Sequence, residues 1–452
     1  MADAGGRVGG ARQKKGVIEM AANRRGTDGV NDITRRQFVR SSLAGAGALA
    51  TGLSAQSRVQ AAGANGRIGV GFIGTGGRSK AHLEVVHWLA TQKKSPVDIA
   101  AVCDVYRPRM EKAAKSYKAP KLYMDYRDLL ADEKVDVVCI STPDHHHVPQ
   151  TIAAMRAGKD VYCEKPLSHW RQFDLVRKFE QVARETKRVF QLGTQGMSDA
   201  AWHQMKALVE EGLIGQPIHA EAGFFRVGDW GERGMPIDDA NAKPGPDLNW
   251  GAFLGDSPQR DFDVSRFFRW RMYEDYAGGP VTDLYPHTLT PVAAILGLTW
   301  PSRVVATGGK FRYEEREVPD TFNMLMDYPE RLTVSVLGTQ GNDYQTTESR
   351  GASGRVPIIR GWKGALMVRD KKIAFIPVRG NKVSAKTFAI EHREDLTEHW
   401  LNFLQCCQNR DRNTYSPADL AVRTQTALIM GMLAYRADKV ARFDQAARQI
   451  VL

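Results

Sequence analysis

The chain has 452 residues, of which 42% are hydrophobic and 25% charged, a balance that is ordinary for a soluble globular protein of two domains. Its formal charge of +12 raises the question of a nucleic-acid partner. Residues 1–64 hold ten basic and four acidic side chains, which leaves 53 against 47 in the rest of the chain. This mild surplus, without a basic stripe interleaved with aromatic residues, argues against nucleic-acid binding.

Residues 1–64 are predicted to be a leader. Arg35 and Arg36, followed by Phe38, resemble a twin-arginine export signal. The weakly apolar stretch that follows, residues 41–53, is too short to span a bilayer, and small residues after it offer cleavage sites. We therefore expect the twin-arginine export machinery to carry the protein to the periplasm. The alternative is a disordered basic tail.

The five cysteines are odd in number and lack paired spacing, so no disulfide framework is predicted. We expect those that end apolar strands to be small buried side chains. The five cysteines are Cys103, Cys139, Cys163, Cys406 and Cys407, and three of them end apolar strands.

An apolar run at 67–73 precedes a glycine-rich turn and then a helical pattern, the context of a dinucleotide-binding fingerprint. Gly74 permits the tight turn, and Gly76 lets a pyrophosphate approach the backbone at the helix N-terminus. Ser79 stands where the third glycine is expected, and it either loosens packing, caps the helix or reaches a phosphate. Gly77 and Arg78 complete the predicted phosphate-binding turn.

The second strand, 97–103, ends at Asp104. A carboxylate there accepts hydrogen bonds from the adenosine ribose and favours NAD. Arg107 and Arg109 would instead suit the 2′-phosphate of NADP, so NADP remains possible.

A third buried strand, 135–141, is followed by Thr142, Pro143 and the three histidines 145–147. Because adjacent side chains diverge, these histidines predict a loop and no metal site. A helix at 170–187 and a strand at 189–193 continue the alternation. Residues 65–214 are thus predicted to form a doubly wound Rossmann domain with a parallel sheet.

Alternating segments at 218–225, 303–307 and 332–337 predict a second α/β domain with a mostly antiparallel open sheet, spanning residues 215–452. Two helices, at 395–409 and 417–435, close it. Aromatic faces stack on sugar rings and arginine binds hydroxyl or acidic groups. The alternative to such sugar contacts is that the aromatic residues of this domain form an aromatic core or an oligomer interface. The predicted substrate contacts are Arg226, Trp230, Arg271 and Tyr273.

The apolar run 161–163 ends in Glu164, Lys165 and Pro166. Proline removes a donor and turns the backbone, and the carboxyl end of a parallel strand faces the ligand crevice. Lys165 should therefore stand at that crevice, where it can exchange protons.

Asp283 and His287 are spaced i, i+4, so a helix would place them on one face. Pro286 lies between the two residues, and Pro291 follows Thr290. With Thr290 as N-cap and Pro291 at the first position, we expect the helix to begin there, which leaves the geometry of the pair open.

The glycine-rich turn, the Glu-Lys-Pro tripeptide and the Asp/His pair resemble the glucose–fructose oxidoreductase/inositol dehydrogenase (Gfo/Idh/MocA) family, from about residue 67 to near the C-terminus. The resemblance implies a cis peptide before Pro166. It implies that His287 is the general base or proton shuttle, that Asp283 orients it or binds substrate, and that Lys165 supplies charge and proton exchange. It also places a further set beside the cofactor: Thr142, Pro143, His147, Glu164 and Lys165.

Together these features predict a nicotinamide-dependent oxidoreductase that acts on a sugar, polyol or glycoside hydroxyl. Outside the cytoplasm no free NAD(H) pool is expected, so the cofactor should be tightly bound and kept between turnovers. A homo-oligomer through the C-terminal sheet is also expected. Residues 287–291 resemble the His-x-Leu-x-Pro stretch of NAD-dependent glycosidases, which is one alternative; a non-catalytic sugar-binding protein is another.

Overall fold

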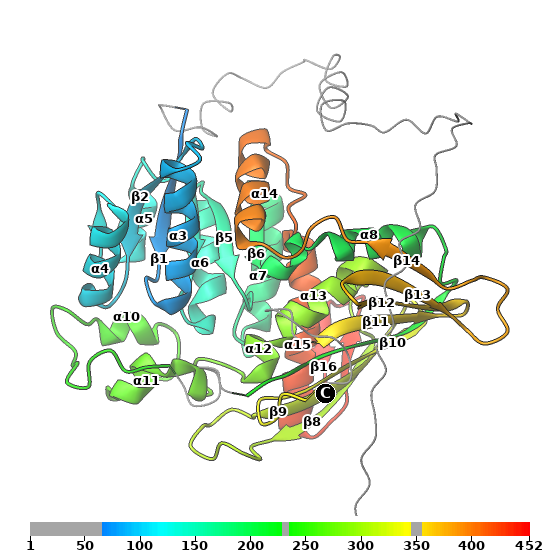
Figure 1. The fold of residues 1–452 in the computed structure, drawn as a ribbon. Helices are drawn as coiled ribbons and strands as arrows, with labels where there is room; N and C mark the ends of the chain where they lie inside the picture. Colours follow the sequence, from blue (N-terminus) through cyan, green and yellow to red (C-terminus); the bar gives the residue numbers. More distant parts are fainter. Residues whose placement is uncertain (1–65, 228–234, 345–354) are drawn as a thin grey trace, which may run out of the picture. The chain divides into compact units, whose positions relative to one another are not determined.

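A computed structural model describes residues 66–227, 235–344 and 355–452. The predicted leader, with Arg35 and Arg36, and the predicted substrate contact Trp230 lie outside these residues. The described chain contains two sheets, each with helices packed on it (Figure 1). Within the described residues, no helix is both long and apolar enough to cross a bilayer.

The first sheet has six parallel strands in the order β3-β2-β1-β4-β5-β6. This order is that of a doubly wound dinucleotide-binding fold, and it confirms the predicted Rossmann domain. The strands are β1 (Ile68–Ile73), β2 (Val97–Cys103), β3 (Leu122–Tyr123), β4 (Val137–Ile140), β5 (Asp160–Glu164) and β6 (Phe190–Gly193). The helices between them are α3 (Gly77–Thr91), α4 (Arg107–Tyr117), α5 (Tyr126–Ala131), α6 (Asp144–Arg156) and α7 (Phe173–Thr186).

Strands buried on both faces need helices on both faces. Helices α3 and α4 cover one face, and α6 and α7 lie against the other. The first face is completed from the far end of the chain by α14 (Leu396–Asn409). Trp400 of α14 stacks on Tyr162 of β5, with ring centroids 4.6 Å apart and planes 7° from parallel. A late helix therefore belongs to the core of the Rossmann sheet.

The second sheet has ten described strands, in the order β14-β13-β12-β11-β7-β10-β9-β8-β15-β16. Only β7 and β10 pair in parallel among these neighbours, which confirms the mostly antiparallel sheet. The strands are β7 (Pro217–Phe225), β8 (Arg303–Gly309), β9 (Thr321–Tyr328), β10 (Leu332–Thr339), β11 (Arg355–Gly361), β12 (Gly364–Arg369), β13 (Lys372–Pro377), β14 (Lys386–Ala389), β15 (Ala441–Asp444) and β16 (Gln449–Val451).

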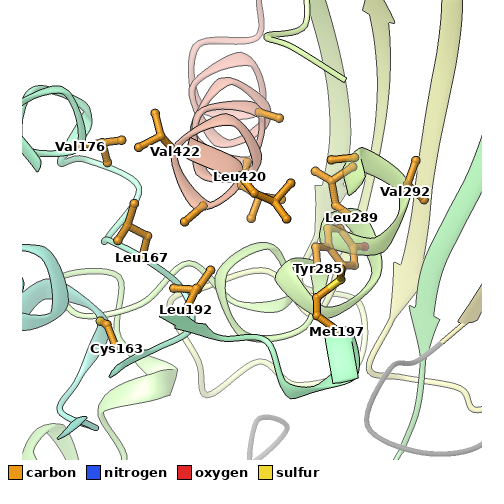
Figure 2. Packing of buried hydrophobic residues seen from close by; sticks show 14 of the residues in the cluster. Cys163, Leu167, Val176, Leu192, Met197, Tyr285, Leu289, Val292, Leu420 and Val422 are labelled. Carbon is orange, nitrogen blue, oxygen red and sulfur yellow. The ribbon is translucent and has the colours of Figure 1, made fainter. Parts of the chain in front are cut away.

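Helices α8 (Ala200–Glu210), α13 (Tyr285–Leu296) and α15 (Ala418–Ala437) pack on this sheet. One continuous core joins the two sheets through α15. In Figure 2, Leu420 and Val422 of α15 lie between Leu167 and Val176 on the Rossmann side and Leu289 of α13. The core thus fixes the end of β5 relative to α13.

The predicted start of a helix at Pro291 is wrong. Helix α13 begins at Tyr285, with Pro286 in its first turn and Pro291 inside it. Asp283 ends the short preceding helix α12 (Pro280–Asp283), so Asp283 and His287 lie on two consecutive helices. Pro291 has no N–H to donate to the carbonyl of His287, but the helix is buried on nearly every side, and this packing outweighs the local rule.

The predicted loop at the three histidines is also wrong. Helix α6 begins at Asp144, directly after Pro143, and the histidines form its first turn. His145 and His147 are buried and His146 is partly buried. All five cysteines are buried and free.

Candidate active site

A cavity of about 1370 Å³ lies where the carboxyl ends of the parallel strands meet residues of the second half of the chain. We call residues 235–277 the cover segment; it contains α10 (Trp250–Leu254), α11 (Val264–Phe268) and the turn η2 (Trp270–Met272). Rossmann residues line one side of the cavity, and the cover segment lines much of the other.

The glycine-rich turn lines the cavity between β1 and α3. Gly74 has a φ of +84°, and a Cβ there would stand 2.8 Å from the carbonyl oxygen of Ser141, so this position needs glycine. Gly76 is the N-cap of α3, which leaves the first amides of the helix to the cavity. Gly77 and Arg78 also line it. This cradle of bare backbone at a helix N-terminus fits a dinucleotide pyrophosphate.

Ser79 does not reach the cavity. Its side chain is fully buried and its hydroxyl has no hydrogen-bond partner among the described residues. Of the three roles open to Ser79 in the sequence, capping and phosphate contact do not match this placement; it packs under the turn.

Glu164, at the end of β5, is buried behind the turn and does not line the cavity. Its Oε1 accepts from Arg78 Nε and faces His82 Nε2, both at 2.8 Å. Burial opposes ionisation of this carboxyl, but Arg78 and His82 outweigh it and hold its pKa well below the usual value. Glu164 therefore positions Arg78 from behind, and a direct cofactor contact does not fit its place.

The tautomer of His82 follows from its partners. Trp400 Nε1 donates to His82 Nδ1 at 3.0 Å, so that nitrogen is an acceptor. His82 Nε2 then carries the proton and donates to Glu164. Burial lowers the pKa of His82, in keeping with a neutral ring. Helix α14 thus supports Glu164, and through it Arg78, at the glycine-rich turn.

Asp104 stands at the end of β2 and lines the cavity. Its Oδ2 accepts from the backbone N and the hydroxyl of Thr75, at 2.7 and 2.8 Å, and Oδ1 accepts from the N–H of Tyr106 at 2.9 Å. A carboxylate has about four acceptor positions, so one remains for a ribose hydroxyl. Asp104 both braces the turn and is placed to hold the ribose.

The loop after β4 brings Thr142 and Pro143 to the cavity. His147 is not among the lining residues: its ring lies between the carbonyl oxygens of Pro166, at 2.6 Å, and Thr142, at 2.8 Å. Burial lowers the pKa of His147 to about 4. The neutral ring can donate to one carbonyl at a time, and it ties this loop to the residue after Lys165.

His145 and His146 contradict the expectation that adjacent side chains diverge. Their rings lie 4.0 Å apart, and the Nε2 atoms of both reach the carbonyl oxygen of Phe253, at 2.9 and 2.6 Å. A Cβ on Gly255 would stand 2.8 Å from His146. The pair therefore anchors the cover segment to α6. No cluster suited to a metal ion occurs in the described part of the chain.

Lys165 lies on the cavity wall, after β5, and its peptide bond to Pro166 is cis. Its Nζ donates to Oδ1 of Asp283 at 2.8 Å and to the Asp283 backbone carbonyl. Arg271 Nε donates to the same Oδ1 at 3.1 Å. Burial disfavours the Asp283 carboxylate, but Lys165 and Arg271 hold its pKa well below the usual value. Two cations thus share one carboxylate.

His287 completes this end of the cavity. Burial, followed by the charge of Lys165, lowers the pKa of His287 to about 3, so its ring is neutral. Nδ1 has no hydrogen-bond partner among the described residues. The ring makes no hydrogen bond to the carboxylate of Asp283, which is engaged by Lys165 and Arg271. The catalytic roles of these three residues stay predictions, but the structure brings the three together.

Asp144 was not singled out from the sequence. It is buried at the start of α6, hydrogen-bonds Thr282 and keeps Oδ2 without a partner among the described residues. Burial raises its pKa to about 7, although Arg271 and Lys165 oppose that shift. A carboxyl after Pro143 signals only a helix start, so nothing local indicated its burial beside the site.

Of the predicted substrate contacts in the described residues, two line the cavity and one does not. Arg226 lines the cavity and its guanidinium lies 5.4 Å from the ring centre of Phe224. Arg271 lines it too, stacked on Trp270 at 4.2 Å. Tyr273 does not line it: its hydroxyl donates to Ser265 at 2.7 Å inside the cover segment, so a substrate contact is not supported by its place.

Comparison with known proteins decides the family. Residues 68–194 match the profile described as "Oxidoreductase family, NAD-binding Rossmann fold" and residues 198–452 the one described as "Oxidoreductase family, C-terminal alpha/beta domain". The chain belongs to the Gfo/Idh/MocA oxidoreductase family. This family is one of NAD(P)-dependent oxidoreductases, and the cavity described above is the candidate active site of this chain.

Individual relatives are more distant. An inositol 2-dehydrogenase of Salmonella typhimurium is 34% identical over 154 residues, which are 34% of this chain and 43% of that protein. A glycosyl hydrolase family 109 protein of Shewanella is 27% identical over 175 residues, 36% of each. The chain thus spans less than half the length of these curated relatives. A levoglucosan dehydrogenase solved with NADH and L-sorbose superposes with a TM-score of 0.61 at 17% identity, over 84% of this chain and 99% of that one; this likeness shows the fold alone.

Proposed function

We propose that this protein oxidises a secondary hydroxyl of a sugar or polyol with NAD as hydride acceptor. The observation that carries the proposal is the grouping of Lys165, Asp283 and His287 at one end of a cavity whose other end is a dinucleotide cradle. The names of the inositol and levoglucosan dehydrogenases agree with such a substrate.

The charge balance at this end favours loss of a hydroxyl proton. Lys165 and Arg271 are two cations beside the single carboxylate of Asp283. A net positive surrounding stabilises negative charge as it develops on a substrate oxygen, and more strongly in a buried site than in water. When bound, NAD supplies the carbon that accepts hydride. Lys165 and Arg271 then hold and polarise the hydroxyl being oxidised.

His287 serves as a proton relay in this proposal. Its neutral ring accepts a hydrogen bond from the substrate hydroxyl, but burial and Lys165 disfavour a lasting imidazolium. A ring of this kind does not store the proton but passes it on to solvent, so that the hydroxyl, having lost a hydride to NAD and a proton to solvent, becomes a carbonyl. Asp283 fixes the position of Lys165 with its side chain and its backbone carbonyl together.

Asp104 supports NAD as the cofactor, because a carboxylate at the end of the second strand pairs with ribose hydroxyls and repels a 2′-phosphate. We also propose export through the twin-arginine signal at Arg35 and Arg36, retention of the cofactor between turnovers, and a homo-oligomer formed through the C-terminal sheet. If extensively dialysed protein from the periplasm releases no nicotinamide on denaturation, retention is wrong.

The test of the reaction is to incubate the purified protein with pooled polyols, free sugars and glycosides and to measure NADH, both bound to the protein and free in solution, and free aglycone. Net NADH from polyols or sugars supports the dehydrogenase. Free aglycone without net NADH supports the second candidate, an NAD-dependent glycosidase, which residues 287–291 and the match to a family 109 protein favour. Neither product from any compound would favour the sugar-binding alternative.

A further inference from the structure

The structure assigns a second determinant of cofactor choice: Asp238 of the cover segment captures Arg109 and makes the ribose end of the cavity selective for NAD over NADP. This inference rests on the proposed function only in that a nicotinamide dinucleotide binds the cradle.

Arg109 is in the first turn of α4, five residues after Asp104, and it lines the cavity. A Cβ on Gly76 would stand 3.6 Å from Arg109 Nη1, so the guanidinium lies over the glycine-rich turn. An arginine at this place is the group that a 2′-phosphate would use, because its planar fork binds phosphate oxygens in pairs.

The cover segment already engages that guanidinium. Arg109 Nε donates to Oδ2 of Asp238 at 2.6 Å, and the guanidinium carbon lies 5.0 Å from the ring centre of Phe268. Asp238 itself lines the cavity. A 2′-phosphate would therefore have to displace a carboxylate from Arg109 and then lie between two carboxylates, those of Asp238 and Asp104. The unphosphorylated ribose of NAD meets neither penalty.

A neighbouring ion pair makes it possible to distinguish cofactor selection by Asp238 from a purely structural link between α4 and the cover segment. Arg107 Nε donates to Oδ1 of Asp247 at 2.9 Å, on the same helix turn and the same cover segment. Neither Arg107 nor Asp247 lines the cavity. Both pairs tie α4 to the cover segment, but only the pair of Arg109 and Asp238 faces the nucleotide. Asp247→Asn is thus a matched control for Asp238→Asn.

The experiment measures equilibrium binding of NADH and NADPH, by nucleotide fluorescence, to full-length protein first stripped of any retained nucleotide, and needs no turnover. We expect the wild type to prefer NADH. Asp238→Asn should tighten NADPH binding about tenfold, the size of one charge-assisted contact, and leave NADH within about twofold. Asp247→Asn should leave the preference unchanged. Arg109→Ala in the Asp238→Asn background should abolish the gain.

Two outcomes would overturn the inference, and they are distinguishable. If Asp238→Asn changes the NADPH-to-NADH ratio no more than Asp247→Asn does, Asp238 only bridges the two parts, and the proposed function stands. If neither nucleotide binds the wild type, the proposed function and this inference fall together.

Discussion

Both ends of the cavity use an ion pair between the Rossmann strands or helices and the later chain, but in different surroundings. At the inner end, the side chains of Lys165 and Asp283 are 10% and 18% exposed and rest on a continuous core. At the outer end, those of Arg109 and Asp238 are 25% and 43% exposed. A charge is less screened when it is buried, so the inner pair should govern reaction rate and the outer pair should govern preference among ligands.

The elements that hold the two ends in place also differ: the inner end rests on the buried core, and the outer end does not. The inner end is set by β5, α12 and α13, which share the core that α15 completes (Figure 2). The outer end depends on the cover segment, held by the histidine pair on Phe253 and by Arg107 on Asp247. The contrast predicts large, position-specific losses at one end and graded shifts at the other.

The largest effect is expected for Lys165→Ala. Turnover should fall by about 10²-fold or more, as for a lost acid–base group, while cofactor binding persists because the glycine-rich turn is untouched. Arg271 still contacts Asp283, so that carboxylate keeps a partner. Steady-state rates and nucleotide titration measure the two effects. Lys80→Ala is the control, since Lys80 also lines the cavity but pairs with Glu84. Wild-type turnover in Lys165→Ala would mean that Lys165 takes no part in the reaction.

An intermediate effect is expected for Asp104→Ala. Binding of NADH should weaken by about tenfold or more, and that of NADPH less, because a hydrogen-bonded carboxylate is lost from the ribose. Thr75→Ala removes one bond that braces Asp104 and leaves the carboxylate in place. It therefore measures the bracing role alone. Equal weakening of both nucleotides in Asp104→Ala would mean that Asp104 supports only the turn.

The last prediction concerns stability, not activity or binding, and its dependence on pH at Asp144. Its pKa is raised from 3.8 to about 7 in the folded protein, so between these values the folded state binds more protons than the unfolded state. Asp144 should therefore make stability fall as pH rises from about 4 to about 7. In Asp144→Asn that slope is lost. Denaturant titrations at several pH values measure it, and parallel curves for the variant and the wild type would contradict the shift.

The sequence alone determined the strand, turn and helix that begin the Rossmann domain, and it singled out the candidate reactive groups. A buried apolar run, a glycine-rich turn and a helical pattern predict a dinucleotide cradle, since each signal depends only on near neighbours. The same holds for Lys165 at the end of β5 and for Asp104 at the end of β2. The family motifs then predicted that Asp283 and His287 lie in the same site as Lys165.

Only the tertiary structure decided how those groups are paired. Asp283 turns to Lys165 and Arg271, Glu164 turns inward to Arg78 and His82, and Asp238 reaches Arg109 across 129 positions of the chain. Tertiary packing also allows α13 to continue through Pro291 and places α14 against the Rossmann sheet. Local propensity amounts to about 1 kcal/mol per residue, whereas burial and long-range ion pairs depend on the register of distant elements, which no short window of sequence records.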